Sequence, residues 1–255
     1  MYPTLIKFGS VSISSFSVMV LIAFLVAYYL CEKDLIKRGE DRNIADLLLI
    51  ASVVGGLGGA KLLFLYQNAT ISEVVQDPMR YLSSGYTFLG GLIGAILLIY
   101  IVSVYKKVSF FHLTDISAAP LILAYGIGRI GCLLVGDDYG VPTNLPWAVS
   151  FPNGAPPTIQ KVHPTQVYDA ICMFIIFYFL WKLKDKGHPT GWLTSVTFIV
   201  LGTQRFIVEF IRTTTPSFID GLSQAQLISL VLIFLGIIIM VIVSSKNKYK
   251  AVQVN

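Results

Sequence analysis

Seven long apolar segments constrain this chain more than any other feature of its sequence. A membrane-crossing helix needs about 20 mainly apolar residues. Runs of about that length follow one another along the chain: Val11–Cys31, Ala45–Tyr66, Phe88–Tyr105, Leu113–Val135, Thr165–Trp181, Gly191–Ile211 and Ala225–Val243. Because lipid offers the backbone no hydrogen-bond partners, segments that cross it form helices. We therefore expect an all-α, polytopic membrane protein with seven transmembrane helices, built as a single transmembrane helical domain over residues 1–255.

The composition supports the same fold class. Hydrophobic residues make up 55% of the 255 residues and charged residues only 13%, whereas soluble domains carry roughly 25% charged residues. A water-soluble globule of this size could not cover its surface. This excludes a soluble enzyme, a disordered chain and a nucleic-acid-binding domain, although the net charge is +5. We expect membrane lipids as partners and no nucleic acid.

The distribution of Lys and Arg predicts how the chain crosses the membrane. Twelve of them lie in the first, third and fifth connections and after the last span, against four in the N-terminal segment and the other connections. By the positive-inside rule the N-terminus is outside and the C-terminus is cytoplasmic. The longest connection, residues 136–164, then forms a loop segment on the outer face. Long loops are usually functional or disordered, so we expect the chemistry there.

One arginine lies deep in an apolar segment. Ionisable residues inside spans are costly and face the bundle interior or a water-filled cavity. Arg129 lies near the outer end of the fourth span, with Gly126, Gly128 and Gly131 around it. Its permanently charged, planar guanidinium matches the geometry of a phosphate or a carboxylate. The alternative is a structural ion pair with a carboxylate on another helix.

The sixth span carries further charges. Arg205 and Glu209 are four residues apart and Arg212 follows three later, so we expect all three on one helix face. Glu209 is either a functional carboxylate or the counter-ion of the two arginines. Arg205 and Arg129 approach the outer surface at similar depth. Together they predict an anion site, and the natural anion at that depth is a phospholipid headgroup.

Other candidate groups cluster at the expected outer mouth. Asp137 and Asp138 follow the fourth span. They orient Arg129, act as a general base, or form a plain solvated turn. His163, before the fifth span, exchanges protons near neutral pH or serves as a structural hydrogen-bonding group. Cys132 is either a small apolar filler or a nucleophile. The three cysteines show no metal-ligand spacing, and we expect neither a metal nor a cofactor.

Three features favour structural roles. The glycines at 55–59 and 90–94 have small-xxx-small spacing, which predicts tight helix packing. Lys61 can extend its ammonium group to the interface. Asp115 lies at the cytoplasmic start of a span, where capping of a helix N-terminus is the favoured role.

Several blocks of this sequence, in order and spacing, resemble those of the bacterial phosphatidylglycerol–prolipoprotein diacylglyceryl transferases. The blocks are Gly90-Gly91-Leu-Ile-Gly94, Gly128-Arg-Ile-Gly131, Gly136-Asp-Asp-Tyr-Gly140, Leu145-Pro-Trp147 with Phe151-Pro152, His163-Pro-Thr-Gln-Val-Tyr-Asp169, Arg205-Phe-Ile-Val-Glu-Phe-Ile-Arg212 and Ser223-Gln-Ala-Gln226. They extend through most of the chain. Seven spans with the N-terminus outside also agree with that family.

The resemblance implies an activity and a location. The family transfers the diacylglyceryl group of phosphatidylglycerol to the lipobox cysteine thiol of a prolipoprotein precursor peptide, forming a thioether and releasing glycerol phosphate. Such a protein is a multi-pass protein of the bacterial cytoplasmic (inner) membrane. For single residues, the resemblance implies that Arg129 holds the lipid phosphate, with Gly131 and Gly140 in the same substrate-binding part. It implies that Arg205 assists the departing phosphate.

Four positions depart from the family pattern. Leu89 stands where the family has a histidine, Cys132 where it has an asparagine, and Phe16 where it has a tyrosine; Asp137 replaces a glutamate. Without a histidine at position 89, the thiol proton would pass to Asp137, Glu209 or His163, or to solvent at the outer mouth. Two alternatives stay open. In the first, the protein is a divergent relative that transfers the group to another acceptor. In the second, it is a non-catalytic lipid-binding membrane protein.

Overall fold

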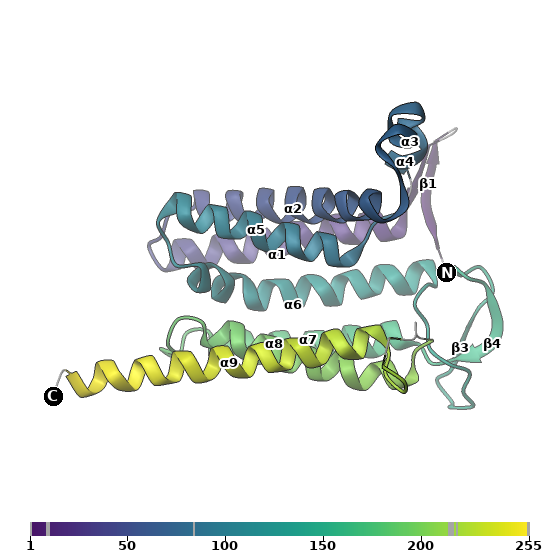
Figure 1. The fold of residues 1–255 in the computed structure, drawn as a ribbon. Coiled ribbons are helices and arrows are strands. Elements are labelled where there is room, and N and C mark those ends of the chain that lie inside the picture. The colour runs from purple at the N-terminus through teal and green to yellow at the C-terminus, as the bar shows by residue number, and fades with distance from the viewer. Residues whose placement is uncertain (1, 9–10, 84, 214–216, 218, 254–255) are drawn as a thin grey trace. The chain divides into compact units, whose positions relative to one another are not determined.

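The computed structural model of this protein describes residues 2–8, 11–83, 85–213, 217 and 219–253. Within them, helices and short strands follow in the order β1 (Thr4–Phe8), β2 (Val11–Ser14), α1 (Ser15–Lys37), α2 (Asn43–Asn68), α3 (Ile71–Gln76), α4 (Pro78–Ser83), α5 (Phe88–Lys106), α6 (Phe110–Val135), β3 (Val149–Phe151), β4 (Thr158–Val162), α7 (Thr165–Leu183), α8 (Trp192–Val208), the 3-10 turn η1 (Glu209–Ile211) and α9 (Gln224–Gln253) (Figure 1).

The expected fold class is confirmed. Seven of the described helices are long and apolar enough to cross a membrane: α1, α2, α5, α6, α7, α9 and α8 extended through η1. Many of their large apolar side chains are exposed, among them Leu62 at 70% and Phe234 at 64%. Side chains of this kind need a lipid environment to cover them. The protein is therefore a multi-pass membrane protein.

The start of the first helix differs from the prediction. Val11–Ser14 does not begin the helix but forms β2, which pairs antiparallel with β1. The alternation of β-branched and polar residues in Val11-Ser-Ile-Ser14 is typical of a strand, and helix α1 begins only at Ser15. The helix then continues to Lys37, beyond the expected end at Cys31.

The chain divides into two compact units, and each is described by itself. The first unit comprises Met1–Ala27 and Thr114–Asn255. The expectation of one single domain stays a prediction. The core of the first unit lies where α6, α7 and α8 meet, and consists of Ala118, Ala119, Ile122, Met173, Leu180 and Leu193. Helices α8 and α9 lie side by side (Figure 1). Gly202 and Gly236 allow this approach, since a Cβ atom at either would lie 2.8 Å from a backbone oxygen of the other helix.

A carboxylate of α6 fixes the beginning of α8. Asp115 accepts hydrogen bonds from the backbone N–H groups of Gly191 (2.6 Å) and Thr194 (2.7 Å) and from the Thr194 hydroxyl (2.6 Å). Asp115 thus caps a helix N-terminus, but that of α8 and not that of its own span, which begins earlier, at Phe110. The first N–H groups of a helix have no partner within it, so this contact satisfies two of them across the helix pair.

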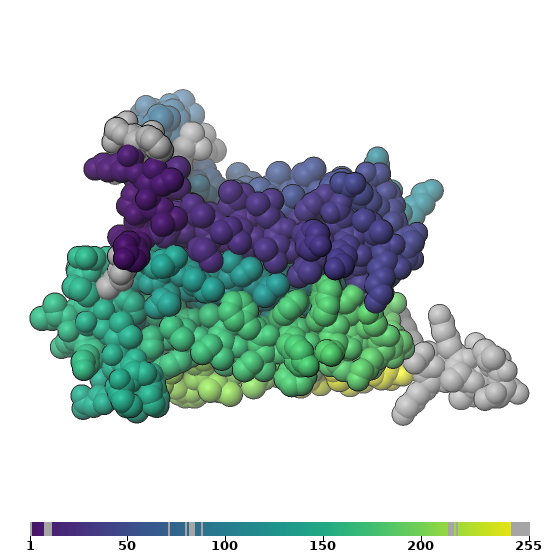
Figure 2. All heavy atoms as spheres, turned by 180° about the vertical axis from the view of Figure 1, so that it is seen from behind, coloured from purple at the N-terminus to yellow at the C-terminus, as the bar shows by residue number. Residues whose placement is uncertain are grey.

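The connection between α6 and α7 is ordered by short backbone pairings. Strands β3 and β4 form an antiparallel hairpin. Gly140 pairs with Arg212 and Pro142 with Val162 as isolated β-bridges. In Figure 2 this connection forms a projection at one end of the helices of the first unit. The bridge to Arg212 joins the connection to the end of α8 and η1.

The second unit, Tyr28–Leu113, is built on the close contact of α2 and α5. These helices lie side by side (Figure 1), and the glycines predicted to allow tight packing face one another. At the end of α2, the Lys61 ammonium donates hydrogen bonds to the backbone oxygens of Tyr81 and Gly85, each at 3.1 Å, and lies 4.2 Å from the centre of the Tyr86 ring. Lys61 is therefore bound by the α4–α5 connection.

A substitution on α2 tests the glycine contact. A Cβ atom at Gly55 would lie 2.5 Å from the carbonyl oxygen of Gly94, whereas one at Gly58 would meet no described atom within 4 Å. We expect Gly55→Ala to lower the free energy of unfolding in detergent by about 1–3 kcal/mol, because over-packing displaces the helices. Gly58→Ala is the matched control and should leave stability nearly unchanged. Equal thermal unfolding of the two variants would contradict the assignment.

Candidate functional site

Arg129 is the centre of a cluster of paired charges at one end of the first unit. It lies on α6 and is 8% exposed. Its guanidinium donates to the Tyr125 hydroxyl, from Nη2 at 2.8 Å and from Nε at 3.2 Å. Nη1 donates to Asp138 Oδ2 at 2.8 Å, and Nε lies 3.0 Å from Asp169 Oδ2. Tyr125 is one helical turn before Arg129 and Asp169 comes from α7, so two helices hold the guanidinium.

Asp169 itself is buried and fixed. Its side chain is fully buried, and its Oδ1 accepts a hydrogen bond from Gln204 Nε2 of α8 at 2.7 Å. The Nη1 atom of Arg212 lies 3.7 Å from its Oδ2. Burying a carboxylate is costly unless it is paired and hydrogen-bonded. Asp169 therefore joins α6, α7 and α8 through one charged side chain.

A second group of charges follows at the end of α8. Glu209 is 5% exposed and its Oε2 lies 2.8 Å from Arg205 Nη2 and 3.7 Å from Arg212 Nε. Its Oε1 accepts a hydrogen bond from the Ser223 hydroxyl at 3.0 Å. Glu209 thus has the geometry of a counter-ion shared by two arginines, one of the two roles considered from the sequence.

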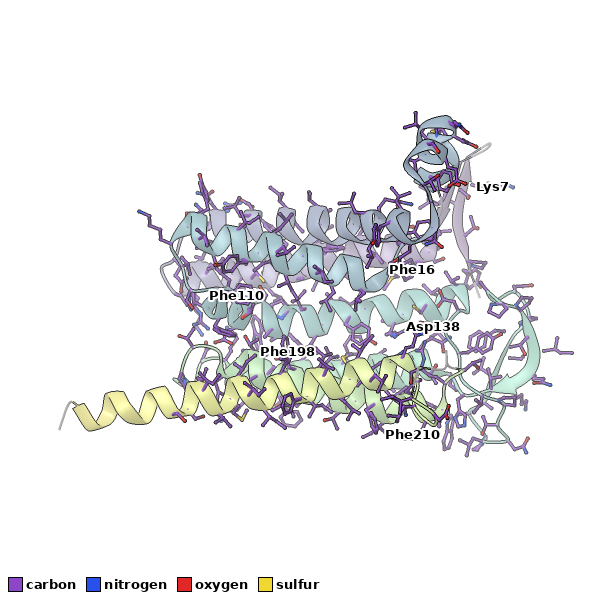
Figure 3. The ribbon with its side chains drawn as sticks, in the orientation of Figure 1. Lys7, Phe16, Phe110, Asp138, Phe198 and Phe210 are labelled. Carbon is purple, nitrogen blue, oxygen red and sulfur yellow. The ribbon has the colours of Figure 1, made fainter. Side chains whose placement is uncertain are left out.

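Asp138 connects the two groups. Its Oδ2 accepts from Arg129 Nη1 at 2.8 Å and its Oδ1 lies 2.9 Å from Arg212 Nη2. Its side chain is 48% exposed. Burial alone would raise the pKa of Asp138, but the positive charges of Arg212 and Arg129 outweigh burial and lower that pKa below its ordinary value. Asp138 is therefore an ionised carboxylate between two guanidinium groups. Figure 3 shows it beside the last turns of α6, at the same end of the first unit as Phe210 of η1.

Asp137 has a different environment from its neighbour. Burial raises its pKa above the ordinary value and the charge of Asp138 adds to this, while a hydrogen bond with Cys132 and the nearby arginines oppose it. The Cys132 sulfur and one carboxylate oxygen each of Asp137 and Asp138 lie within 4.8 Å of one another. These donor atoms are of the kind that hold metals, but Arg129, also bound to Asp138, opposes a cation there. The pKa values of the two adjacent aspartates are thus shifted in opposite directions, that of Asp137 upward and that of Asp138 downward.

The remaining candidates surround this cluster. His163 is half-buried, with Nδ1 3.3 Å from the Tyr168 hydroxyl, which accepts a hydrogen bond from Trp147 Nε1 at 2.7 Å. Gly140 lies against His163 and the backbone oxygen of Ile211, where a side chain would not fit. Its N–H donates to the His163 carbonyl at 2.9 Å. Gly140 therefore allows the connection to approach the end of η1.

Gly131 and three of the positions that depart from the family pattern, Phe16, Leu89 and Cys132, lie on three different helices. A Cβ atom at Gly131 would lie 3.0 Å from Met19 Cβ and 3.3 Å from the Phe16 ring of α1, so Gly131 allows α1 to pack against α6. Phe16, in place of the family tyrosine, is thus beside the Arg129 helix. Cys132 is buried, and Arg129 Nη1 lies 3.9 Å from its sulfur. Leu89, in place of the family histidine, is 44% exposed at the start of α5 in the second unit.

One sequence prediction about this site is wrong. We expected Arg205, Glu209 and Arg212 on one helix face, but α8 ends at Val208, η1 follows, and Arg212 is extended with φ −97° and ψ 157°. The β-bridge with Gly140 ends the helix, because the backbone of Arg212 pairs with Gly140 and cannot continue the helix. Arg212 turns instead toward Asp138. The contacts from Arg129 to Arg205 consequently run through Asp138, Arg212 and Glu209.

Sequence reasoning did not find three members of the cluster: Tyr125, Asp169 and Gln204. Each had a weak signal. Tyr125 precedes Arg129 by four residues, which places the two on one helix face. Asp169 and Gln204 are polar residues within apolar spans. Their pairing with one another requires knowledge of how α7 and α8 pack.

The fold and this cluster define a multi-pass membrane protein with buried, carboxylate-paired arginines at one end of its first unit. A family model described as Prolipoprotein diacylglyceryl transferase matches residues 3–242. A phosphatidylglycerol–prolipoprotein diacylglyceryl transferase of Clostridium tetani is 33% identical over 243 residues, covering 94% of this chain and 96% of that protein. Enzymes of the same description from Bordetella avium and Thermotoga maritima are 31% and 30% identical, each over 96% of this chain, and over 96% and 85% of their own lengths. The chain belongs to the prolipoprotein diacylglyceryl transferase family.

The central carboxylate of the cluster offers a test of its structural role. We expect Asp169→Asn to lower the free energy of unfolding by up to about 3–5 kcal/mol, because it leaves the buried charges of Arg129 and Arg212 underpaired. Asp220→Asn removes the same charge at an exposed position and should have little effect. Thermal unfolding in detergent measures both, and equal stability of the two variants would show that Asp169 does not hold the cluster together.

Proposed function

We propose that this protein transfers the diacylglyceryl group of phosphatidylglycerol to a cysteine thiol of prolipoproteins, at the cluster around Arg129. The observation that carries the proposal is the set of three guanidinium groups, Arg129, Arg205 and Arg212, held by carboxylates at the ends of α6 and α8. Deep arginines in a membrane protein suit an anionic headgroup. The named relatives supply the donor and the acceptor: phosphatidylglycerol and prolipoprotein.

The cluster then faces the outside of the bacterial cytoplasmic membrane. The excess of Lys and Arg in the connections at the opposite ends of the helices supports this orientation. It places the N-terminus and the connection 136–164 outside and the C-terminus in the cytoplasm. A secreted precursor peptide and the outer leaflet lipid meet at that face.

The reaction requires stabilisation of the leaving phosphate. When sulfur attacks the carbon that bears the phosphate, the carbon–oxygen bond breaks and its electron pair stays with glycerol phosphate. The phosphate then carries one more negative charge than in the lipid. Fixed guanidinium groups in a site with little water stabilise such a developing charge. We assign phosphate binding to Arg129 and stabilisation of the leaving phosphate to Arg205, with Glu209 orienting Arg205.

The thiol must lose its proton, because the thiolate is the nucleophile. Among the candidates, Glu209 is held by Arg205 and Ser223, and His163 by Tyr168. Asp137 has a raised pKa and a buried Oδ1 without a hydrogen-bond partner among the described residues. We assign the base to Asp137. It takes the thiol proton and passes it to the glycerol phosphate, so that charge and protons balance.

Arg129→Lys tests the phosphate assignment. Lysine keeps the charge but loses the planar pair of donors, so we expect the rate of transfer to fall by about 100-fold. The measurements are glycerol phosphate release from phosphatidylglycerol and thioether formation on a lipobox peptide. Lys161→Gln, at an exposed position of β4, serves as the control and should keep wild-type rates. Near-normal turnover by Arg129→Lys would refute the assignment, and binding of lipid by the wild type without glycerol phosphate release would refute the enzyme.

The pH dependence tests Asp137. A base must be ionised to accept a proton, and the raised pKa of Asp137 keeps it protonated at pH values where an exposed aspartate is already ionised. We therefore expect kcat/KM to increase with pH through that raised pKa. Asp137→Asn should lose this rising limb along with most of the activity. A residual activity of the variant that follows the wild-type profile would assign the limb to another group.

A further inference from the structure

We propose that Arg212 is a second phosphate-binding residue beside Arg129, and that Asp138 holds their shared anion position until the phosphodiester of the lipid displaces it. This inference rests on the proposed function and concerns the same site. It assigns Asp138 as a positioning residue, in exchange with the substrate, and Arg212 as a direct ligand of the phosphate.

The geometry of Asp138 is that of a bridging oxyanion. Its two carboxylate oxygens lie 2.8 Å from Arg129 Nη1 and 2.9 Å from Arg212 Nη2. A phosphodiester likewise presents two charged oxygens and one negative charge, and arginine binds carboxylate and phosphate with the same donors. The spacing of the two guanidinium groups thus suits an anion that places one oxygen against Arg129 and another against Arg212.

Exposure decides which carboxylate can leave. The side chain of Asp138 is 48% exposed, whereas Asp169 is fully buried and Glu209 is 5% exposed. Asp169 also accepts from Gln204, and Glu209 from Ser223. Removing either of these from its partners would leave a buried charge unpaired, which is strongly unfavourable. Asp138 can turn into water at much lower cost.

The backbone under Asp138 stays in place when its side chain turns. The buried Thr165 hydroxyl donates to the Asp138 carbonyl at 2.7 Å, and the Gln166 amide donates to the Asp137 carbonyl. These contacts bind the connection to the first turn of α7. Asp138 also has φ +59°, a left-handed conformation that Asp and Asn adopt more readily than most residues. A rotation of the side chain is therefore sufficient for the exchange.

Charge balance favours an exchange over simple addition. Arg129, Arg205 and Arg212 are matched by Asp138, Asp169 and Glu209. A phosphodiester added to these matched pairs would bring an unpaired negative charge into a poorly solvated site, beside Asp137, which is also negative when it acts as the base. When Asp138 leaves as the phosphate enters, one negative charge replaces another.

Arg212 also retains donors for the incoming group. Its side chain is 8% exposed, and its Nη1 is buried without a hydrogen-bond partner among the described residues. A guanidinium carries five N–H donors, and the contacts of Arg212 with Asp138, Asp169 and Glu209 leave some unused. Phosphate oxygens accept such donors well.

Binding of a short-chain phosphatidylglycerol to the purified full-length protein tests this inference. Asp138→Asn and Asp138→Gly both tolerate the left-handed backbone, and both remove the competing charge. We expect each to lower the Kd for the lipid by about threefold to tenfold. If Asp138 instead only orients Arg129, both variants will bind the lipid more weakly, and an unchanged or increased Kd overturns the proposal.

The role of Arg212 is tested in the same assay. Arg212→Gln should raise the Kd about tenfold or more, and Asp138→Asn added to it should lower the Kd by less than it does in the wild type. Lys161→Gln removes one positive charge at an exposed position and is the control. If Arg212→Gln does not fold, Arg212→Lys replaces it, with a smaller rise in Kd expected. A wild-type Kd in the folded variant overturns the assignment of Arg212.

Two further arms separate the possible failures. Glycerol phosphate as the probe distinguishes a free phosphate ester from the lipid: tighter binding of glycerol phosphate alone, with the lipid unaffected, overturns the exchange with substrate. Glycerol phosphate release by the wild type tests the proposed function independently. An active wild type whose Asp138 variants bind lipid more weakly would refute only the exchange.

Discussion

The pairing of Arg129 with carboxylates from two segments is the interaction on which the rest of the site depends. A guanidinium cannot be neutralised by losing a proton, and an unpaired charge in a poorly solvated interior costs several kcal/mol. Arg129 avoids that cost because it forms ion pairs with Asp169 of α7 and with Asp138 of the connection that follows α6. Asp169 in turn reaches α8 through Gln204. The need to pair the charge of Arg129 thus joins α6, α7 and α8 at the same end.

The connection 136–164 completes the charged cluster. It contributes two neighbouring acids that have different environments. Asp138 lies between two guanidinium groups, whereas Asp137 lies against Cys132. Gly140 allows the connection to lie against η1, and the β-bridge there turns Arg212 toward Asp138. A glycine and a helix end therefore bring Arg212 to Asp138.

The sequence was informative where a single local pattern determines the structure. Hydrophobic length predicted the seven crossing helices, and glycine spacing predicted tight helix packing, which the structure shows between α2 and α5. It also identified Arg129, Arg205 and Asp137, because charged groups in or beside apolar spans are rare enough to stand out. It misplaced Arg212, since helical spacing says nothing of the β-bridge that ends α8. It could not find the pairing of Asp169 with Arg129, which depends on the packing of α6 against α7 and on no local signal.

The capping of α8 by Asp115 has a consequence for the far end of the same helices. Helices α6 and α8 run in the same direction, and Asp115 joins them near their starts. An α-helix rises about 1.5 Å per residue, so Arg129 lies about 20 Å along α6 from this junction and Arg205 about 17 Å along α8 from Thr194. Asp115 therefore fixes α6 and α8 relative to one another near their starts. Because both helices are stiff, this contact also fixes the relative positions of Arg129 and Arg205 along them. A shift of α8 by a single turn would move Arg205 about 5 Å relative to Arg129, and the hydrogen bonds of Asp115 oppose such a shift.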